Sequence, residues 1–266
     1  MTPARAPIGV FDSGVGGLSV LRALRQALPH EDLLYAADSG QAPYGDRDAG
    51  FVVTRALAMA DFLHAAGAKA IVVACNTASV LAAAALRERY DLPIVAMEPA
   101  IKPAAALTRS GVVGVLATAG TVASANVERL RREHAGGARV LLQACPGLVE
   151  CVERGELGAE PTRALLRRYV EPLLQAGADT LVLGCTHYAF LAPALREIVG
   201  PDVRLVDAAE AVARETVRRL GALRESGPGL GSERFVTTGA LAPARERMST
   251  LWGRSVDVQA LEAAAS

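Results

Sequence analysis

Short apolar runs alternate along the chain with longer stretches of helical periodicity. The predicted strands are Ile8–Phe11, Leu33–Ala36, Ala70–Ala74, Ile94–Ala96, Val112–Leu116, Val140–Leu142, Thr180–Leu183 and Arg204–Val206. The apolar face of one intervening helix is formed by Leu18, Leu21, Leu24 and Leu28. Because the strands are continuously apolar rather than alternating, we expect parallel sheets covered by helices on both faces, built from βαβ units.

The chain also contains an internal repeat. Residues 66–77 align without gaps on residues 176–187, which places Cys75 and Cys185 at equivalent positions, 110 residues apart. Residues 8–10 align in the same way on residues 113–115, and a turn of small residues follows both segments. The sequence therefore predicts an α/β fold of two pseudo-symmetric, doubly wound domains with mostly parallel sheets and the active site in the cleft between them.

The end of the chain lies outside this repeat. Residues 221–232 are typical of a surface connection, residues 234–238 predict a further strand, and residues 251–258 fit either a helix or a strand. The pattern alone allows this tail to pack on either domain.

The two repeat-equivalent cysteines are the strongest candidates for chemistry. Each ends a predicted strand and precedes a polar pair at a predicted helix start, Asn76-Thr77 or Thr186-His187. Ligands bind at the carboxyl ends of strands in open α/β sheets, and a helix N-terminus holds carboxylates and lowers the pKa of a thiol. One such cysteine is more simply a small buried hydrophobe. Two at equivalent strand ends indicate function, whereas Cys145 and Cys151, at non-equivalent places, are expected only to pack.

The turn after the first strand, residues 12–17, is rich in glycine and partly matches a dinucleotide-binding fingerprint. Ser19 stands where that fingerprint needs a small residue, and the Asp12 carboxylate would repel a pyrophosphate. Asp12 with Ser13 suits an ammonium group and a small polar ligand better. A nicotinamide-dependent oxidoreductase is therefore an alternative of another class.

Three weaker candidates complete the predicted site. The loop of residues 38–46 follows the carboxyl end of the second strand, so we expect it to lie over the same crevice. His187 shares a strand end with a candidate thiol, which favours a functional role. Glu150 fits a supporting role as well as it fits a solvated helix face.

Composition and charge argue against several classes of protein. The 266 residues, 51% of them hydrophobic, suffice for one large or two small α/β domains. A formal net charge of zero argues against nucleic-acid binding, no apolar stretch is long enough to span a membrane, and the first seven residues lack the apolar segment of a signal peptide. The four cysteines lack CxxC spacing and are expected to be thiols in a reducing cytoplasm. We therefore expect a soluble cytoplasmic enzyme with no nucleic-acid or membrane partner.

Five motifs together resemble glutamate racemase of the cofactor-independent amino-acid racemase superfamily. They are Asp12-Ser13-Gly14-Val15-Gly16-Gly17, Ala42-Pro43-Tyr44-Gly45, Ala74-Cys75-Asn76-Thr77-Ala78-Ser79, Gly184-Cys185-Thr186-His187-Tyr188 and Arg234-Phe235-Val236-Thr237-Thr238-Gly239. The resemblance covers essentially the whole chain. The family usually continues the fourth motif with Pro-Leu, where this chain has Ala189-Phe190, beyond the matched catalytic residues.

The resemblance implies interconversion of L- and D-glutamate for peptidoglycan synthesis, no cofactor, and a homodimer. It also implies that residues 98–207 form a domain inserted into a first domain of residues 1–97 plus 208–266. The residues carried over are Cys75 and Cys185 as the catalytic acid/base pair, with Asp12, Ser13, Tyr44, Gly45, Asn76, Thr77, Thr186 and His187 around the substrate. No metal is expected, because Cys75, Cys185, His187 and Asp12 lack the close spacing of a metal site.

The chemistry of the residues agrees with this resemblance. Racemisation removes the Cα proton from one face and returns a proton to the other, which two opposed bases achieve without rotating the substrate. Donors from Asn76, Thr77, Thr186 and the helix N-termini would stabilise the developing enediolate. Two other readings stay open: a racemase of the same superfamily acting on aspartate or another acid, and a non-enzymatic amino-acid-binding module, against which the two cysteines argue.

Overall fold

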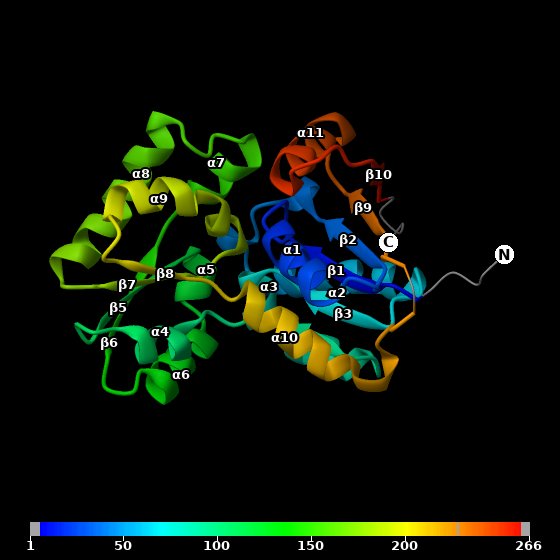
Figure 1. Ribbon diagram of the computed structural model, residues 1–266, viewed down its shortest axis with the longest axis horizontal. Coiled ribbons are helices and arrows are strands. Elements are labelled where there is room, and N and C mark those ends of the chain that lie inside the picture. Colours follow the sequence, from blue (N-terminus) through cyan, green and yellow to red (C-terminus); the bar gives the residue numbers. More distant parts are fainter. Residues whose placement is uncertain (1–5, 228, 262–266) are drawn as a thin grey trace.

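The computed structural model describes residues 6–227 and 229–261, and it contains two sheets, each in its own lobe (Figure 1). The first sheet has the strand order β10-β9-β2-β1-β3-β4, and the second has the order β6-β5-β7-β8. In chain order the strands are β1 Ile8–Asp12, β2 Leu33–Ala37, β3 Ala70–Val73, β4 Ile94–Ala96, β5 Val112–Ala117, β6 Arg139–Ala144, β7 Thr180–Leu183, β8 Arg204–Val206, β9 Glu233–Thr237 and β10 Val258–Ala260. Every strand pair in both sheets is parallel among the described residues. The predicted α/β fold with parallel sheets is confirmed.

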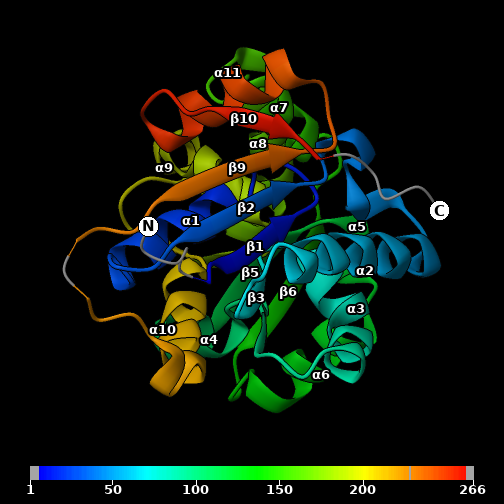
Figure 2. The same ribbon diagram turned by 90° about the vertical axis from the view of Figure 1, so that its right-hand side faces the viewer.

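Helices cover both faces of each sheet (Figures 1 and 2). On the first sheet, α1 (Leu18–Ala27) and α10 (Ala209–Leu220) lie opposite α2 (Ala49–Ala65) and α3 (Asn76–Arg89), and α11 (Leu241–Trp252) packs beside α1. On the second sheet, α4 (Ile101–Leu107) and α6 (Ala125–His134) lie opposite α7 (Leu148–Arg154), α8 (Glu160–Gln175) and α9 (Ala192–Val199), while the short α5 (Ala119–Val122) follows β5. No described helix is long and apolar enough to cross a lipid bilayer.

The two sheets repeat one topology. Strands β2-β1-β3-β4 stand in the same order as β6-β5-β7-β8, and the registers correspond: Ile8 pairs with Ala70, and Val113 pairs with Thr180. The hydrogen bond that follows the last strand pair is also repeated, from the Ala74 amide to Phe11 and from the Gly184 amide to Leu116, each at 2.8 Å. The internal repeat in the sequence therefore corresponds to two copies of one fold.

Two apolar clusters hold the molecule together. One lies between the first sheet and helices α2 and α3, and it includes Phe11, Leu63 and Leu86. The other begins at the opposite face of that sheet, where Leu21 packs, and continues without a break into the second lobe, where it includes Leu181. Since burial of apolar surface is the main favourable term in folding, this shared cluster holds the two lobes against each other.

The predicted division into an inserted domain, residues 98–207, and a first domain, residues 1–97 plus 208–266, stays a prediction. The boundary between residues 97 and 98 falls between β4 and α4, and the boundary between 207 and 208 falls between β8 and α10. Residues 1–5, 228 and 262–266 of the first predicted domain lie outside the described residues.

Element ends differ from the prediction by one or two residues. Strands β1, β2 and β5 each extend one residue further, and β3 ends one residue earlier, because pairing with the neighbouring strand sets where a strand ends. In the ambiguous segment 251–258, α11 ends at Trp252 and β10 begins at Val258. The loop of residues 38–46 contains two short 3-10 helices, Ser39–Gln41 and Tyr44–Asp46, and the surface connection at residues 221–232 begins with another, Gly221–Leu223.

Gly114 in β5 allows helix α8 to lie close to the second sheet. A Cβ at this position would stand 2.7 Å from Leu181 Cδ2 and 2.8 Å from Leu173 Cδ1, which is closer than atoms pack. We expect Gly114→Ala to lower the free energy of unfolding by about 1–3 kcal/mol, measured by urea denaturation, because the neighbours must move to admit the methyl group. Gly50→Ala in α2 is the control, since its Cβ would meet only the Asp48 side chain, at 3.2 Å. Equal stability of Gly114→Ala and wild type would contradict the tight packing.

Candidate active site

The carboxyl ends of the central strands of both sheets meet between the lobes. Thr186, which follows β7, donates a hydrogen bond to Asp12 Oδ2 at the end of β1, at 3.2 Å. Thr77, which follows β3, shares a hydrogen bond of 3.0 Å with Thr118, which follows β5. Each of these strand ends lies where the order of its sheet reverses, the usual ligand position in open α/β sheets.

Cys75 is the N-cap residue of α3. Its Sγ accepts a hydrogen bond from the Ala78 amide at 3.5 Å and donates one to Ser13 Oγ at 3.6 Å. Burial raises the pKa of this thiol far above its usual value, and the nearby Asp12 carboxylate raises it further. Negative charge on Cys185 acts in the same direction on the pKa of Cys75.

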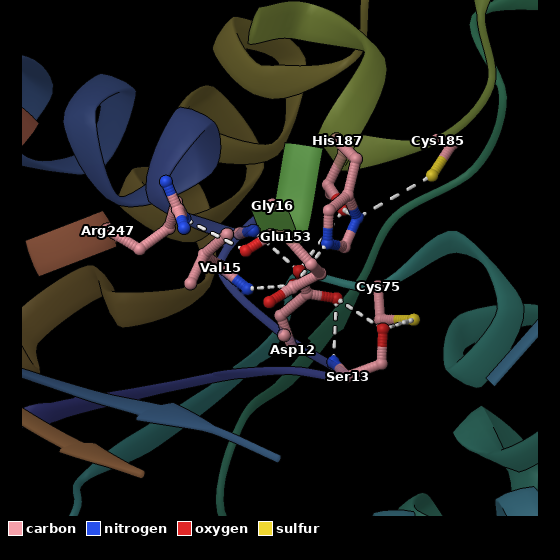
Figure 3. Close-up of polar contacts among 12 residues, drawn as sticks. Asp12, Ser13, Val15, Gly16, Cys75, Glu153, Cys185, His187 and Arg247 are labelled. Atoms are coloured by element: carbon pink, nitrogen blue, oxygen red, sulfur yellow. Dashed lines mark hydrogen bonds and ion pairs between the residues drawn. The ribbon is translucent and has the colours of Figure 1, made fainter. Parts of the chain in front are cut away.

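Cys185 has a different environment, although its place in the fold is equivalent. The predicted helix start at Thr186-His187 is a six-residue 3-10 helix, Thr186–Leu191, and α9 follows it. Cys185 Sγ lies 3.8 Å from Nδ1 of His187, and Nε2 of that imidazole lies 2.7 Å from Oε1 of Glu153 in α7. Figure 3 shows the imidazole between the carboxylate and the thiol.

The pKa of His187 lies well above its usual value. Burial by itself lowers the pKa, but contacts with Cys185, Glu153 and Asp12 outweigh burial and favour the imidazolium form. A protonated imidazole can donate hydrogen bonds at both ring nitrogens, one to Glu153 and one to the sulfur of Cys185.

Asp12 lies at the centre of the network. Its carboxylate is fully buried and accepts hydrogen bonds from the amides of Ser13 at 2.8 Å and Gly17 at 2.5 Å. Burial raises the pKa of Asp12, while the charge of His187 and the amide hydrogen bonds act in the opposite direction. The Asp12 carboxylate of the first lobe and the His187 imidazole of the second lobe therefore share one buried, charged environment.

The glycine-rich turn after β1 provides room for this network. A Cβ at Gly16 would stand 2.3 Å from His187 Nδ1 and 2.6 Å from Thr186 Oγ1. At Gly17 a Cβ would stand 2.7 Å from the Asp12 Cβ. Gly16 therefore allows the second lobe to approach the first, and Gly17 makes room for Asp12 within the first lobe, which accounts for the turn without a dinucleotide.

Tyr44 and Gly45 reach the site from the loop after β2. The Tyr44 hydroxyl donates to Asp38 Oδ2 at 2.5 Å, and burial followed by the Asp38 charge raises the pKa of the phenol. Arg55 pairs with the same buried carboxylate, at 2.9 Å, and Thr238 donates to it at 2.7 Å. Gly45 lies against Thr118, where a Cβ would stand 2.6 Å from the threonine Cβ. Asp38 thus fixes the loop on the first lobe, and Gly45 lies against the second lobe.

Asn76 is unusual because its amide group is buried without a partner. Among the described residues, neither its side-chain oxygen nor its nitrogen forms a hydrogen bond. Thr77, the next residue, bonds to both Thr118 and Thr121. A buried amide without partners is costly, which marks this position as one where a polar ligand would bind.

The structure brings the predicted site residues together with different degrees of contact. One hydrogen-bonded network joins Asp12, Ser13, Cys75, Cys185, Thr186 and His187. Glu150 lines a small cavity with Gly45 and Thr118, so its supporting role stays a prediction. The carboxylate that contacts His187 belongs to Glu153, one turn further along α7.

Sequence reasoning missed Glu153 and Thr118, and it included Asp38 only as the first residue of the loop over the crevice. Thr118 stands at the position equivalent to Ser13 in the internal repeat, so the repeat could have identified it. Glu150 and Glu153 lie on the same short helix, and only the contact between lobes distinguishes them.

The remaining cysteines have surroundings that fit packing. Cys145 and Cys151 are buried, and burial raises the pKa of Cys145 to about 12. Within residues 6–227 and 229–261, no three or more His, Cys, Asp or Glu side chains are placed to hold a metal ion.

The family model described as Asp/Glu/Hydantoin racemase matches residues 8–216. The chain belongs to this family. It is 60% identical to a glutamate racemase of Ectopseudomonas mendocina over 222 residues, which are 83% of this chain and 84% of the relative. The predicted resemblance to glutamate racemases is confirmed, and the chain is an amino-acid racemase.

Solved structures of glutamate racemases share the whole fold. The Escherichia coli enzyme, in complex with L-glutamate and the activator UDP-MurNAc-ala, superposes with a TM-score of 0.85 at 35% identity, covering 97% of this chain and 98% of that one. The Francisella tularensis enzyme, in complex with D-glutamate, gives a TM-score of 0.85 at 26% identity, covering 98% and 99%. The fold of this racemase is therefore that of structurally known relatives.

Removal of the Glu153 charge should lower the pKa of His187, because that carboxylate stabilises the imidazolium. We expect the ring nitrogens of His187 to titrate at lower pH in Glu153→Gln than in the wild type. NMR of protein labelled with nitrogen-15 histidine measures this titration. Glu150→Gln is the matched control on the same helix and should leave the titration unchanged. An unchanged titration in Glu153→Gln would show that the pair does not set the charge of His187.

Proposed function

We propose that this racemase interconverts L- and D-glutamate without a cofactor, using Cys75 and Cys185 as the two bases. The observation that carries the proposal is the placement of two buried thiols at equivalent strand ends of two equivalent sheets. Relatives named glutamate racemase, and solved relatives holding either enantiomer, support the choice of substrate.

The proposed chemistry moves two protons. A thiolate on one side takes the Cα proton, the negative charge spreads into the substrate carboxylate as an enediolate, and the thiol on the other side gives its proton to the opposite face of Cα. One sulfur gains a proton and the other loses one, so the two cysteines exchange roles in the reverse direction. Burial and Asp12 favour the protonated form of Cys75 in the free enzyme. The imidazolium of His187 can stabilise negative charge on Cys185.

The groups around the thiols suit an amino acid. We assign the substrate carboxylate to the Asn76 amide, Thr77, Thr186 and the N-terminus of α3, which supply donors for the charge that develops there. A hydrogen bond to a buried unpaired amide recovers about 1–3 kcal/mol. Asp12 and Ser13 provide the acceptor side for the ammonium group, and Tyr44 and Gly45 close the site from the loop after β2.

The cellular role follows from the proposed product. D-Glutamate would supply peptidoglycan synthesis in the cytoplasm. We further propose, as the resemblance implies, a homodimer in which residues 98–207 form a domain inserted into residues 1–97 plus 208–266.

Purified, dialysed protein should racemise L-glutamate with no cofactor added, and it should turn over L-aspartate far more slowly, because the Cys75 and Cys185 motifs resemble those of glutamate racemases. Loss of circular dichroism from each acid measures both rates. Comparable rates on the two acids would favour a broader racemase, and activity that appears only with added pyridoxal phosphate would overturn the cofactor-free mechanism.

Cys75→Ser and Cys185→Ser should each abolish racemisation, since a serine hydroxyl is too weak an acid to replace a thiol. Each should still eliminate a leaving group at C3 of a glutamate analogue, a reaction that needs only one base. By resemblance, Cys75→Ser keeps elimination from the L analogue and Cys185→Ser keeps it from the D analogue. Ultraviolet detection of the unsaturated product measures this crossover. If both variants keep the same enantiomer, the thiols do not face opposite sides of Cα.

A further inference from the structure

Helix α11 of the first lobe contacts the end of helix α7 in the second lobe. The last turn of α7 closes through hydrogen bonds from the Gly155 amide to Val152 and from the Glu156 amide to Cys151. The carbonyl of Glu153 lies beyond these bonds, as expected for a helix C-terminus. Nε of Arg247, in α11, donates to that carbonyl at 2.8 Å (Figure 3).

Gly155 makes this contact between the lobes possible. It ends α7 in the left-handed conformation, with φ of 77°, and a Cβ there would stand 1.8 Å from Nη1 of Arg247. The half-buried guanidinium therefore lies directly against the helix end. A positive charge at a helix C-terminus is also electrostatically favourable.

The contact acts on the residue that orients His187. The backbone of Glu153 is held by Arg247, and its side chain accepts from the Val15 amide at 2.8 Å and contacts His187 at 2.7 Å. His187 in turn lies 3.8 Å from Cys185. Cys75 has other partners, Ser13 and the Ala78 amide. The chain of contacts from α11 thus reaches Cys185 directly from His187, whereas it reaches Cys75 only through Thr186, Asp12 and Ser13.

We propose that Arg247 is a positioning residue for the Cys185 side of the site. It fixes the last turn of α7, so that Glu153 holds the imidazole of His187 in line with the sulfur. Without this contact the Glu153 carboxylate is less constrained and proton transfer at Cys185 slows, while proton transfer at Cys75 does not. The inference rests on the proposed two-thiol mechanism.

Racemisation rates alone do not reveal this asymmetry. The two enantiomers have equal free energy in water, so the equilibrium constant is one and kcat/KM changes by the same factor in both directions. Elimination from C3-substituted analogues involves one thiol at a time and separates the two sides. The Cys185→Ser variant identifies which enantiomer depends on Cys185.

The test compares Arg247→Met with Arg247→Lys and with Arg245→Met. Arg245 lies on the same helix, and its pair with Asp257, at 2.8 Å, is exposed. In Arg247→Met we expect racemisation and elimination from the Cys185-dependent enantiomer to fall together, by roughly 10- to 100-fold, because displaced catalytic groups lose rate on this scale. Elimination from the other enantiomer should stay at the wild-type rate. Arg247→Lys should recover part of the loss, and Arg245→Met should match the wild type.

A second pair of variants approaches the contact from α7. Gly155→Ala should displace the guanidinium and reproduce the selective loss. Gly67→Ala places the same strain, at φ of 79°, where nothing lies within 4 Å, and it should lose stability without selective loss of activity. Urea denaturation measures how much of each effect is unfolding.

Each result either supports or overturns the proposal. If the cysteine variants show the crossover, two results in Arg247→Met would overturn the proposal. One is an equal fall in elimination rate for both enantiomers, and the other is no fall for either. Absence of that crossover in the cysteine variants would instead reject the two-thiol mechanism. The nitrogen-15 titration of His187 does not depend on turnover: Arg247→Met should shift it to lower pH, toward the curve of Glu153→Gln, and an unshifted curve counts against the positioning role.

Discussion

The close approach of the turn after β1 to the segment after β7 is the constraint on which the rest of the site depends. Gly16 has no side chain where His187 and Thr186 lie, so the carboxyl ends of the two sheets can approach each other closely. A methyl group on Gly16 would push Thr186 away from Asp12. It would also push His187 away from the first lobe. The hydrogen bonds across this junction replace water at groups that would otherwise be buried and unpaired.

The two halves repeat one topology but not one chemistry. The strand registers coincide, and each half places a cysteine at the same strand end. Cys75 caps an α-helix and contacts a hydroxyl group, whereas Cys185 opens a 3-10 helix and contacts a charged imidazole. The repeat positions two thiols symmetrically, and the residues that differ between the halves give each thiol its own electrostatic environment. A racemase needs the symmetry of position, since its substrates are mirror images at one carbon.

Connections outside the repeat stabilise the site from a distance. The Asp38 carboxylate accepts hydrogen bonds from Tyr44, from Arg55 and from Thr238 in the tail. Arg247, also in the tail, donates to the Glu153 carbonyl at the end of α7. The tail strands β9 and β10 extend the first sheet beside β2, which brings α11 within reach of the second lobe. The tail, which has no counterpart in the repeat, therefore contacts both the loop of the first lobe and helix α7 of the second lobe.

Sequence by itself determined the fold class, every described strand except β10, and the two thiols, because these depend on local apolar patterns and on similarity between two segments of the chain. It also singled out Asp12, Thr186 and His187, which stand next to recognisable strand ends. Only the tertiary structure distinguished Glu153 from Glu150, joined Asp38 to Tyr44, and left the amide of Asn76 unpaired. It also decided that Thr186-His187 begins a 3-10 helix and that α11 reaches α7. The contacts of Glu153 with His187 and of Arg247 with Glu153 join residues far apart in the chain. They depend on how the two lobes pack, and no local pattern of side chains carries that information.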